Sequence, residues 1–146
     1  MEVVLARIEE LEEVSRLFDL YRVFYNQSSD LEAARSFIQQ RFHQKNSKIF
    51  IARVQERTVG FTQLYPSFSS VSMKPIWILN DLFVEEAARN QGIAKLLMGT
   101  AENFAREIGA IRIILSTQVA NFAAQSLYHS LGYIKNEEFY QDSLRL

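Results

Sequence analysis

Residues 76–109 read IWILNDLFVEEAARNQGIAKLLMGTAENFAREIG, and this stretch decides the fold prediction. Its first part, residues 76–84, is densely apolar and predicts a strand, although the polar pair Asn80 and Asp81 interrupts it. After Gly92, apolar side chains recur at helical spacing, and Gly109 is placed to end the helix. The sequence therefore predicts a strand, a polar loop and a long helix in series.

The flanking sequence predicts more strands and helices on both sides of this stretch. Upstream we expect a first strand, two helices of which the second is capped by Ser29 with Glu32, and a hairpin closed by Pro66 and followed by a loop. Downstream we expect a strand, a short helix that leaves at Gly132, and two final strands. The predicted ranges are strands 3–8, 48–54, 59–65, 111–116, 133–134 and 139–146, helices 10–24, 29–42 and 121–130, and a loop over 67–75.

This order, β-α-α-β-β-β-α-β-α-β-β, predicts an α/β fold with a mixed sheet and helices on its faces. A length of 146 residues fits one domain over 1–146. The net charge of −1 gives no general attraction to nucleic acid or to an anionic membrane, so neither is expected as a partner. No secretory leader is recognisable at the start, and a cytoplasmic location is expected.

The sequence contains no cysteine, which excludes disulfides, thiolate zinc sites and a cysteine nucleophile. Its only histidines, His43 and His129, are too few for a metal cage, and no metal is predicted.

The loop before the long helix has the features of a diphosphate site. The first turn of a helix has unpaired N–H groups and a positive potential, which favour anions. Gly92 permits positive φ and close approach of the main chain, Ala94 leaves the turn uncrowded, and Arg89 and Lys95 add positive charge. The alternative is an ordinary glycine in a strand-to-helix turn.

Two blocks of sequence resemble those of the GCN5-related N-acetyltransferases (GNAT). The first is Arg89-x-x-Gly92-x-Ala94 after a strand that ends Leu82-x-Val84. The second is Asn121-x-x-Ala124-x-x-Leu127-Tyr128-x-x-x-Gly132-Tyr133. The resemblance implies the GNAT-like fold with two splayed parallel strands, acetyl-CoA as cosubstrate, and a homodimer.

The resemblance also implies where acetyl-CoA binds. The main chain of the 82–84 strand would pair with the pantetheine arm, and a donor near Leu82 or Phe83 would polarise the thioester carbonyl. The loop and first helical turn would hold the pyrophosphate, and the second block would line the cofactor wall. The implied cofactor residues are Leu82, Phe83, Val84, Arg89, Asn90, Gln91, Gly92, Ile93, Ala94, Lys95, Asn121, Phe122 and Ala124.

Tyr128 matches the family tyrosine that faces the thioester sulfur, and the resemblance implies that it protonates the leaving thiolate. The general base is less determined, because no Glu begins the 76–84 strand, where some relatives carry one. Asp81 is the candidate, since a carboxylate in an apolar strand is either paired or functional. Glu137 or Glu138 could serve instead, and Asp81 could equally be a buried structural acceptor.

Aromatic and acidic side chains predict an acceptor site that attracts a cation, formed by the loop between the first two helices, residues 67–73 and the terminal strands. The residues expected there are Tyr21, Tyr25, Tyr65, Phe68 and Glu137. The resulting function prediction is an N-acetyltransferase that acts on a primary amine of a small molecule or a protein by direct attack. A non-catalytic module that binds acyl-CoA for regulation is the alternative.

Overall fold

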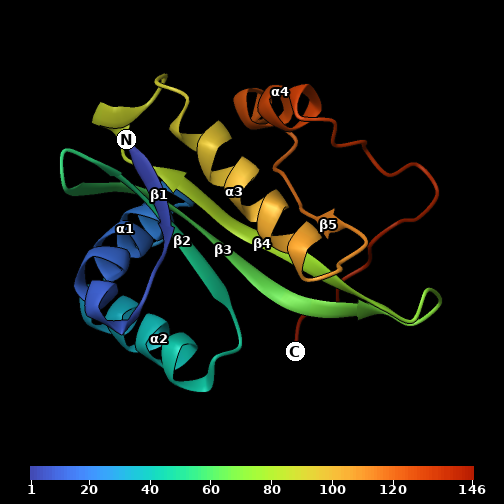
Figure 1. The fold of residues 1–146 in the computed structure, drawn as a ribbon, viewed down its shortest axis with the longest axis horizontal. Helices are drawn as coiled ribbons and strands as arrows, with labels where there is room; N and C mark the ends of the chain where they lie inside the picture. Colours follow the sequence, from blue (N-terminus) through green and yellow to red (C-terminus); the bar gives the residue numbers. More distant parts are fainter. The chain divides into compact units, whose positions relative to one another are not determined.

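The computed structural model describes residues 1–146, which form two compact units, Met1–Leu115 and Ser116–Leu146. The first unit contains the whole β-sheet and three of the four α-helices, and the second contains the last helix (Figure 1). No helix is long and apolar enough to span a membrane. The fold class predicted from the sequence, a mixed α/β architecture, is confirmed.

The sheet of the first unit has five strands in the order β1-β2-β3-β4-β5. The pairs β1/β2, β2/β3 and β3/β4 are antiparallel, whereas β4 and β5 are parallel. The strands are β1 (Glu2–Leu5), β2 (Lys48–Val54), β3 (Arg57–Ser69), β4 (Lys74–Val84) and β5 (Ile113–Ile114).

Helices cover both faces of this sheet (Figure 1). The strand β2 shows the reason: its successive side chains point to opposite faces of the sheet, and they are buried on both. Ile49 and Ile51 join the core cluster of α1 and α2, whereas the Phe50 ring lies 5.6 Å from that of Phe104 on α3. The helices of this unit are α1 (Leu11–Phe24), α2 (Leu31–Gln44) and α3 (Ile93–Glu107), with short 3₁₀ turns η1 (Ile8–Glu10) and η2 (Glu86–Ala88).

The strands β3 and β4 are longer than the predicted 59–65 and 76–84, and the expected loop over 67–75 is wrong. The strands remain paired out to Ser69 and Lys74, so only a short turn joins them. Pro66 does not close β3, because the pairing with β2 has already ended at Leu64. Beyond that point β3 is an edge strand, where a missing N–H is tolerated.

A β-bulge explains the polar pair in the apolar strand. Gln63 pairs with Asp81 and the next β3 residue, Leu64, pairs with Leu79, so Asn80 is an extra residue in β4. The bulge leaves Asn80 exposed while Asp81 is buried. The sequence pattern predicted the strand but not this change of register.

The link between α1 and α2 also differs from the prediction. Asp30, not Ser29, caps α2, since its carboxylate accepts from Ala33 N at 3.1 Å. Asp19, expected to face solvent, is buried and accepts from Ser29 Oγ at 2.6 Å and Asp30 N at 2.8 Å. The partners of Asp19 lie about ten residues downstream, so helical periodicity could not identify them.

The second unit contains α4 (Phe122–Ser130), and Gly132 adopts φ 92° directly after it, as expected for a helix exit. The two strands predicted over 133–134 and 139–146 are wrong, because the chain after α4 forms no strand. Asn136 Oδ1 accepts from Glu138 N at 2.8 Å and Phe139 N at 3.2 Å. This local turn uses N–H groups that a strand would offer to a neighbour.

Candidate active site

The parallel strands β4 and β5 are paired over two residues of each strand. Only Trp77 and Ile78 of β4 pair with β5, through Ile113 and Ile114. The strand β4 then continues to Val84 with β3 alone as its partner. The expected strand over 111–116 is therefore reduced to two residues, and the pairing between the two parallel strands ends at Ile78 and Ile114.

The loop that leads into α3 is open at the first helical turn. Gly92 is the N-cap residue with φ 79°, and no side chain caps the helix there. A Cβ added at Gly92 would meet no atom within 4 Å. The first turn carries no acidic side chain, so its N–H groups and positive potential remain available to an anion.

Arg89 links this loop to the end of β4. Its Nε donates to the Val84 carbonyl at 2.8 Å, and its guanidinium lies 5.5 Å from the Phe83 ring centroid and 5.6 Å from that of Phe24. The side chain is exposed, as is Lys95 in the first turn of α3. Both cations predicted near the diphosphate therefore lie around the open helix end.

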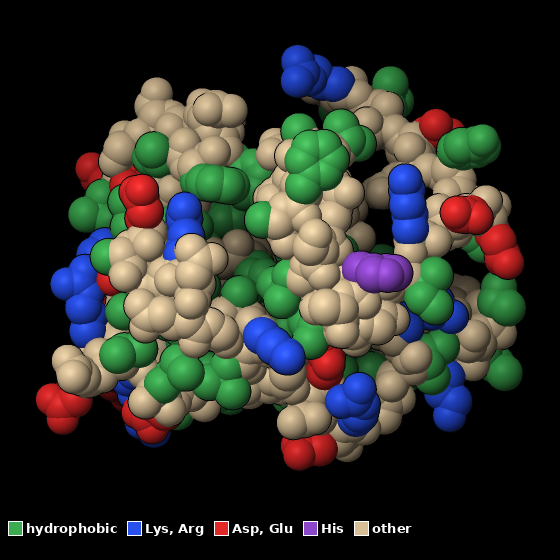
Figure 2. Space-filling model, turned by 90° about the horizontal axis from the view of Figure 1, so that it is seen from above, with side chains coloured by type: hydrophobic (Ala, Val, Ile, Leu, Met, Phe, Trp, Pro, Cys, Tyr) green, Lys and Arg blue, Asp and Glu red, His purple; other side chains and the backbone are tan.

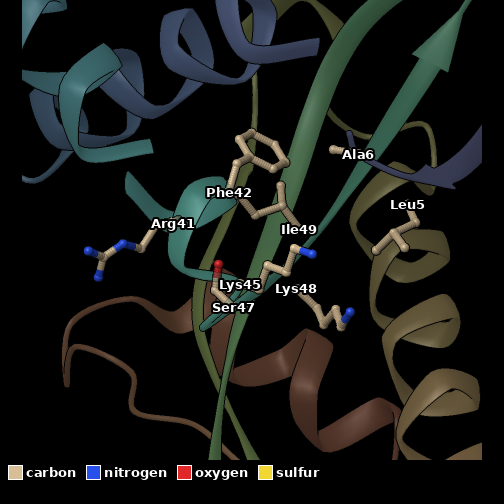
Figure 3. A pocket seen from close by; sticks show the side chains of 8 residues that line it. All are labelled: Leu5, Ala6, Arg41, Phe42, Lys45, Ser47, Lys48 and Ile49. Carbon is tan, nitrogen blue, oxygen red and sulfur yellow. The ribbon is translucent and has the colours of Figure 1, made fainter. Parts of the chain in front are cut away.

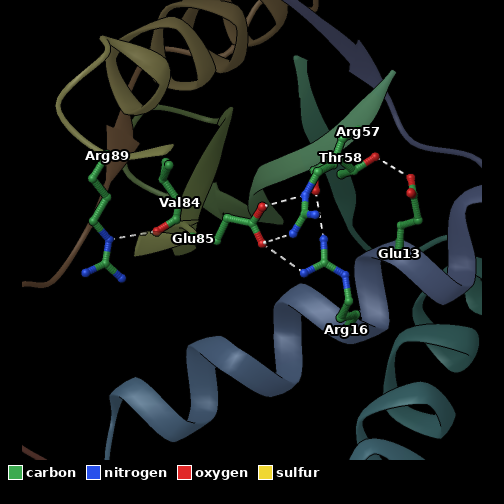
Figure 4. Close-up of polar contacts among 7 residues, drawn as sticks. All are labelled: Glu13, Arg16, Arg57, Thr58, Val84, Glu85 and Arg89. Carbon is green, nitrogen blue, oxygen red and sulfur yellow. Dashed lines mark hydrogen bonds and ion pairs between the residues drawn. The ribbon is translucent and has the colours of Figure 1, made fainter. Parts of the chain in front are cut away.

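Glu85 anchors the start of the same loop to the body of the sheet (Figure 4). Its carboxylate accepts from Arg16 of α1 at 2.9 Å and from Arg57 of β3 at 3.0 Å. Burial alone would raise the pKa of this carboxyl, but hydrogen bonds from Arg57 and Arg16 outweigh it and the pKa is lowered. Arg16 also donates to the Thr58 carbonyl at 2.8 Å, and the Thr58 hydroxyl donates to Glu13.

Asp81 lies at the bulge of β4 and is 3% exposed. Its Oδ2 accepts from Gln63 Nε2 at 2.6 Å, and its Oδ1 accepts from Asn80 Nδ2 at 3.1 Å. Burial raises the pKa of Asp81 above its ordinary value, while hydrogen bonds from Gln63, Asn80 and Tyr21 act in the opposite direction. A buried carboxylate of raised pKa is chemically suited to accept a proton.

Three tyrosine side chains lie in the region of Asp81. The Tyr21 hydroxyl donates to the Asn80 carbonyl at 3.3 Å, and its ring lies 5.0 Å from that of Tyr25. Burial, followed by the charge of Asp81, raises the pKa of Tyr65 to about 12. The structure thus brings Tyr21, Tyr25, Tyr65 and Asp81 to one region of the first unit.

One of the expected acceptor residues, Phe68, does not join this region. Phe68 lies three residues beyond Tyr65 on β3, and strand alternation directs it to the other face of the sheet. Its side chain is 75% exposed. Glu137 belongs to the second unit and is exposed there.

The second of the two sequence blocks lies entirely in the second unit. Asn121 Oδ1 accepts from Ala124 N at 3.1 Å and so caps α4. Tyr128 is half-buried on α4, with its ring 6.0 Å from that of Tyr133, whereas Phe122 is 72% exposed.

Two polar residues beside Asp81 escaped sequence reasoning. Gln63 is completely buried in β3, and its Oε1 accepts from Ser47 Oγ at 2.9 Å. The one available signal was a glutamine inside an apolar strand, which needs a polar partner when buried. Its partner could not be named without the register of β3 and β4.

Ser47 also borders a cavity of about 230 Å³ between β1, the end of α2 and the start of β2 (Figure 3). Arg41, Lys45 and Lys48 contribute to its wall, but the Arg41 guanidinium points away from the two lysine amines.

No group of three or more His, Cys, Asp or Glu side chains is placed to hold a metal ion. The face shown in Figure 2 carries acidic and basic side chains scattered among apolar ones.

A model of the acetyltransferase (GNAT) family matches residues 13–133. The chain therefore belongs to the GNAT acetyltransferase family, as the two sequence blocks predicted. It is 42% identical over 139 residues to the uncharacterized N-acetyltransferase YhfO of Bacillus subtilis (strain 168), with 95% of this chain and 93% of that protein covered. A probable acetyltransferase of Haemophilus influenzae is 32% identical over 99 residues, which are 67% of this chain and 68% of that one.

Solved structures agree with this assignment. The crystal structure of a probable acetyltransferase has a TM-score of 0.96 and 42% identity, and the match covers 100% of this chain and 98% of that one. A ribosomal-protein-alanine N-acetyltransferase from Brucella melitensis biovar Abortus 2308 has a TM-score of 0.83 at 17% identity over the full length of both chains. That second likeness supports the fold alone.

Proposed function

We propose that this protein transfers an acetyl group from acetyl-CoA to a primary amine by direct attack, with both substrates bound together. The observation that carries the proposal is the part of β4 beyond Ile78, which β5 leaves unpaired and which leads through the loop to the open N-terminus of α3. The unpaired edge of β4 offers main-chain groups to an amide-bearing arm. The first turn of α3 offers donors and positive potential to a diphosphate.

The first unit has what acetyl-CoA requires at this place. Residues 90–95 supply main-chain donors for the diphosphate, and the open space at Gly92 admits it without a side-chain clash. Arg89 and Lys95 add charge. A main-chain donor at Leu82 or Phe83 polarises the thioester carbonyl, and the loss of one such donor typically costs about 3 kcal/mol of transition-state stabilisation.

Asp81 is the proposed general base. An amine is protonated at neutral pH and must lose a proton before it can attack a thioester. Asp81 accepts that proton at its carboxylate, and the surrounding rings of Tyr21, Tyr25 and Tyr65 attract the cationic acceptor. A primary amine on a small molecule or on a protein is the proposed acceptor class.

Tyr128 is the proposed general acid, on the strength of the sequence block that contains it. Its hydroxyl donates a proton to the departing thiolate. Asn121, Phe122 and Ala124 of the same block are proposed to contact the pantetheine arm. No covalent acyl-enzyme is needed, and the chain has no cysteine to form one.

The test is an assay of coenzyme A release from acetyl-CoA against spermidine, free lysine and a short peptide with a free N-terminus. Mass spectrometry of the acceptor identifies the acetylated product. We expect turnover with at least one of them, and a loss of at least a hundredfold in kcat for Tyr128→Phe with little change in the Kd for acetyl-CoA. Asp81→Asn should lower kcat/KM most strongly near neutral pH.

Calorimetric titration with acetyl-CoA supplies the control for these variants. Tight binding of acetyl-CoA without turnover on any acceptor would contradict the enzyme and favour the regulatory module. Unchanged turnover in Tyr128→Phe would remove Tyr128 from the mechanism.

A further inference from the structure

A short chain of hydrogen bonds runs through the sheet and ends on the Asp81 carboxylate. Ser47, just before β2, donates to Gln63 Oε1 at 2.9 Å, and Gln63 Nε2 donates to Asp81 Oδ2 at 2.6 Å. Gln63 is 0% exposed and Asp81 is 3% exposed. Three segments that are distant in sequence are therefore connected at the proposed base.

The chemistry of the three side chains determines which group is the donor and which the acceptor in each hydrogen bond. An ionised carboxylate only accepts hydrogen bonds, so the Gln63 amide must present its NH₂ group to Asp81. The amide oxygen of Gln63 then faces Ser47 and needs a donor, which the serine hydroxyl provides. Both hydrogen bonds point toward Asp81 and favour its charged form.

Gln63 also restricts where the carboxylate can point. Its contact of 2.6 Å occupies Oδ2, whereas Oδ1 faces Asn80 at 3.1 Å. Thr62, the neighbour of Gln63 on β3, donates to the main-chain carbonyl of Asp81 at 2.8 Å and does not touch the carboxylate. The main chain and the side chain of Asp81 are thus held by adjacent residues of one strand.

We propose that Gln63 is a positioning residue for Asp81: it fixes one carboxylate oxygen and stabilises the charged form, while Ser47 sets the orientation of the Gln63 amide. The inference rests on the proposed role of Asp81 as base. The other groups around this carboxylate are Tyr21 from α1 and Tyr65 from β3, and Arg41 from α2 interacts with Tyr65. Among the hydrogen bonds that lower the pKa of Asp81, the one from Gln63 has the largest effect, ahead of those from Asn80 and Tyr21.

The test compares Gln63→Leu with Thr62→Val. Leucine keeps the approximate volume of glutamine but removes the donor, and the burial of Asp81 is then opposed by fewer hydrogen bonds. Thr62→Val removes a hydrogen bond to the same residue, from an equally buried position, without touching the carboxylate. Ser47→Ala examines the outer step, and far-UV circular dichroism verifies that each variant is folded.

The primary measurement needs no substrate. Aspartate labelled with ¹³C at the carboxyl carbon is incorporated, the Asp81 resonance is assigned by its loss in Asp81→Asn, and its titration midpoint is followed by NMR. A hydrogen bond to a charged group corresponds to a midpoint change of about one to two pH units. We expect an upward change of that size in Gln63→Leu, a smaller one in Ser47→Ala and none in Thr62→Val.

Kinetics provide the second measurement, with the acceptor that the amine panel identifies. The acidic limb of the kcat/KM profile should move upward in Gln63→Leu by the same amount as the NMR midpoint. An unchanged NMR midpoint in Gln63→Leu would overturn the inference, and an unchanged midpoint in Ser47→Ala would remove Ser47 from it. If no amine is acetylated, the proposed function fails while the NMR titration still decides the placement of Gln63.

Discussion

Replacement of Glu85 by glutamine tests the anchor that holds the loop ahead of α3. Glu85→Gln keeps the shape of the side chain but removes the charge that Arg16 and Arg57 bind at 2.9 and 3.0 Å. Two fully buried charge-assisted hydrogen bonds would contribute roughly 3–6 kcal/mol. The arginine side chains are 38% and 67% exposed and water screens them, so we expect a loss of about 2 kcal/mol.

The assay is urea unfolding followed by far-UV circular dichroism. At a typical slope of 1–3 kcal/mol per M, this loss lowers the midpoint by roughly 1 M. The matched control is Glu12→Gln, which breaks the exposed ion pair with Arg35 and should cost less than about 0.5 kcal/mol.

The stabilisation that Glu85 contributes should change with pH in a defined direction. The pKa of Glu85 in the folded protein lies below the ordinary 4.5, so its contribution is complete above that pH and is lost as the pH falls through the folded value. The gap between wild type and Glu85→Gln should therefore close on acidification. A loss no larger than that of the control, or a gap that widens toward low pH, would refute this account of the anchor.

Three further predictions concern the backbone. Gly92→Ala places a side chain at φ 79° in open space, so it should cost about 1 kcal/mol of strain and weaken acetyl-CoA binding in calorimetry. Gly60→Ala meets the Phe83 carbonyl at 3.0 Å and should cost about 2 kcal/mol in urea unfolding. An unchanged affinity for acetyl-CoA in Gly92→Ala would be inconsistent with an anion site at Gly92. The hairpin turn Gln55-Glu56 has φ 51° and 66°, so the double change to Asn-Gly should raise stability by about 1 kcal/mol, and an unchanged Tm would show that this turn is not strained.

Local sequence patterns predicted the elements that depend mainly on residues close together in the sequence. The helix after Gly92 and its end at Gly109 follow from periodicity and from a residue that tolerates positive φ. The strand predicted over 48–54, the first of the predicted hairpin, is likewise confirmed as β2.

Features that depend on a distant partner were missed or misjudged. The bulge at Asn80 arises because β4 contributes one residue more than β3 to the segment in which the two strands pair. Pro66 was interpreted as a terminator, yet it is accommodated where β3 has lost β2 as a neighbour. Strand periodicity likewise could not reveal that residues 133–146 lack a strand partner.

The same distinction between contiguous and distant residues applies to the candidate site. The diphosphate loop is contiguous in sequence, so its residues could be named from the motif. The surroundings of Asp81 could not, because Ser47, Gln63 and Tyr21 come from three separate segments.

Trp77, the one tryptophan of the chain, lies where β4 makes its final contacts with β5. It is 8% exposed, and its ring is 5.2 Å from that of Phe104 on α3. The protein thus carries an intrinsic fluorophore where the pairing of β4 with β5 ends. Emission from this single indole should report ligand binding along the unpaired part of β4, without any attached dye.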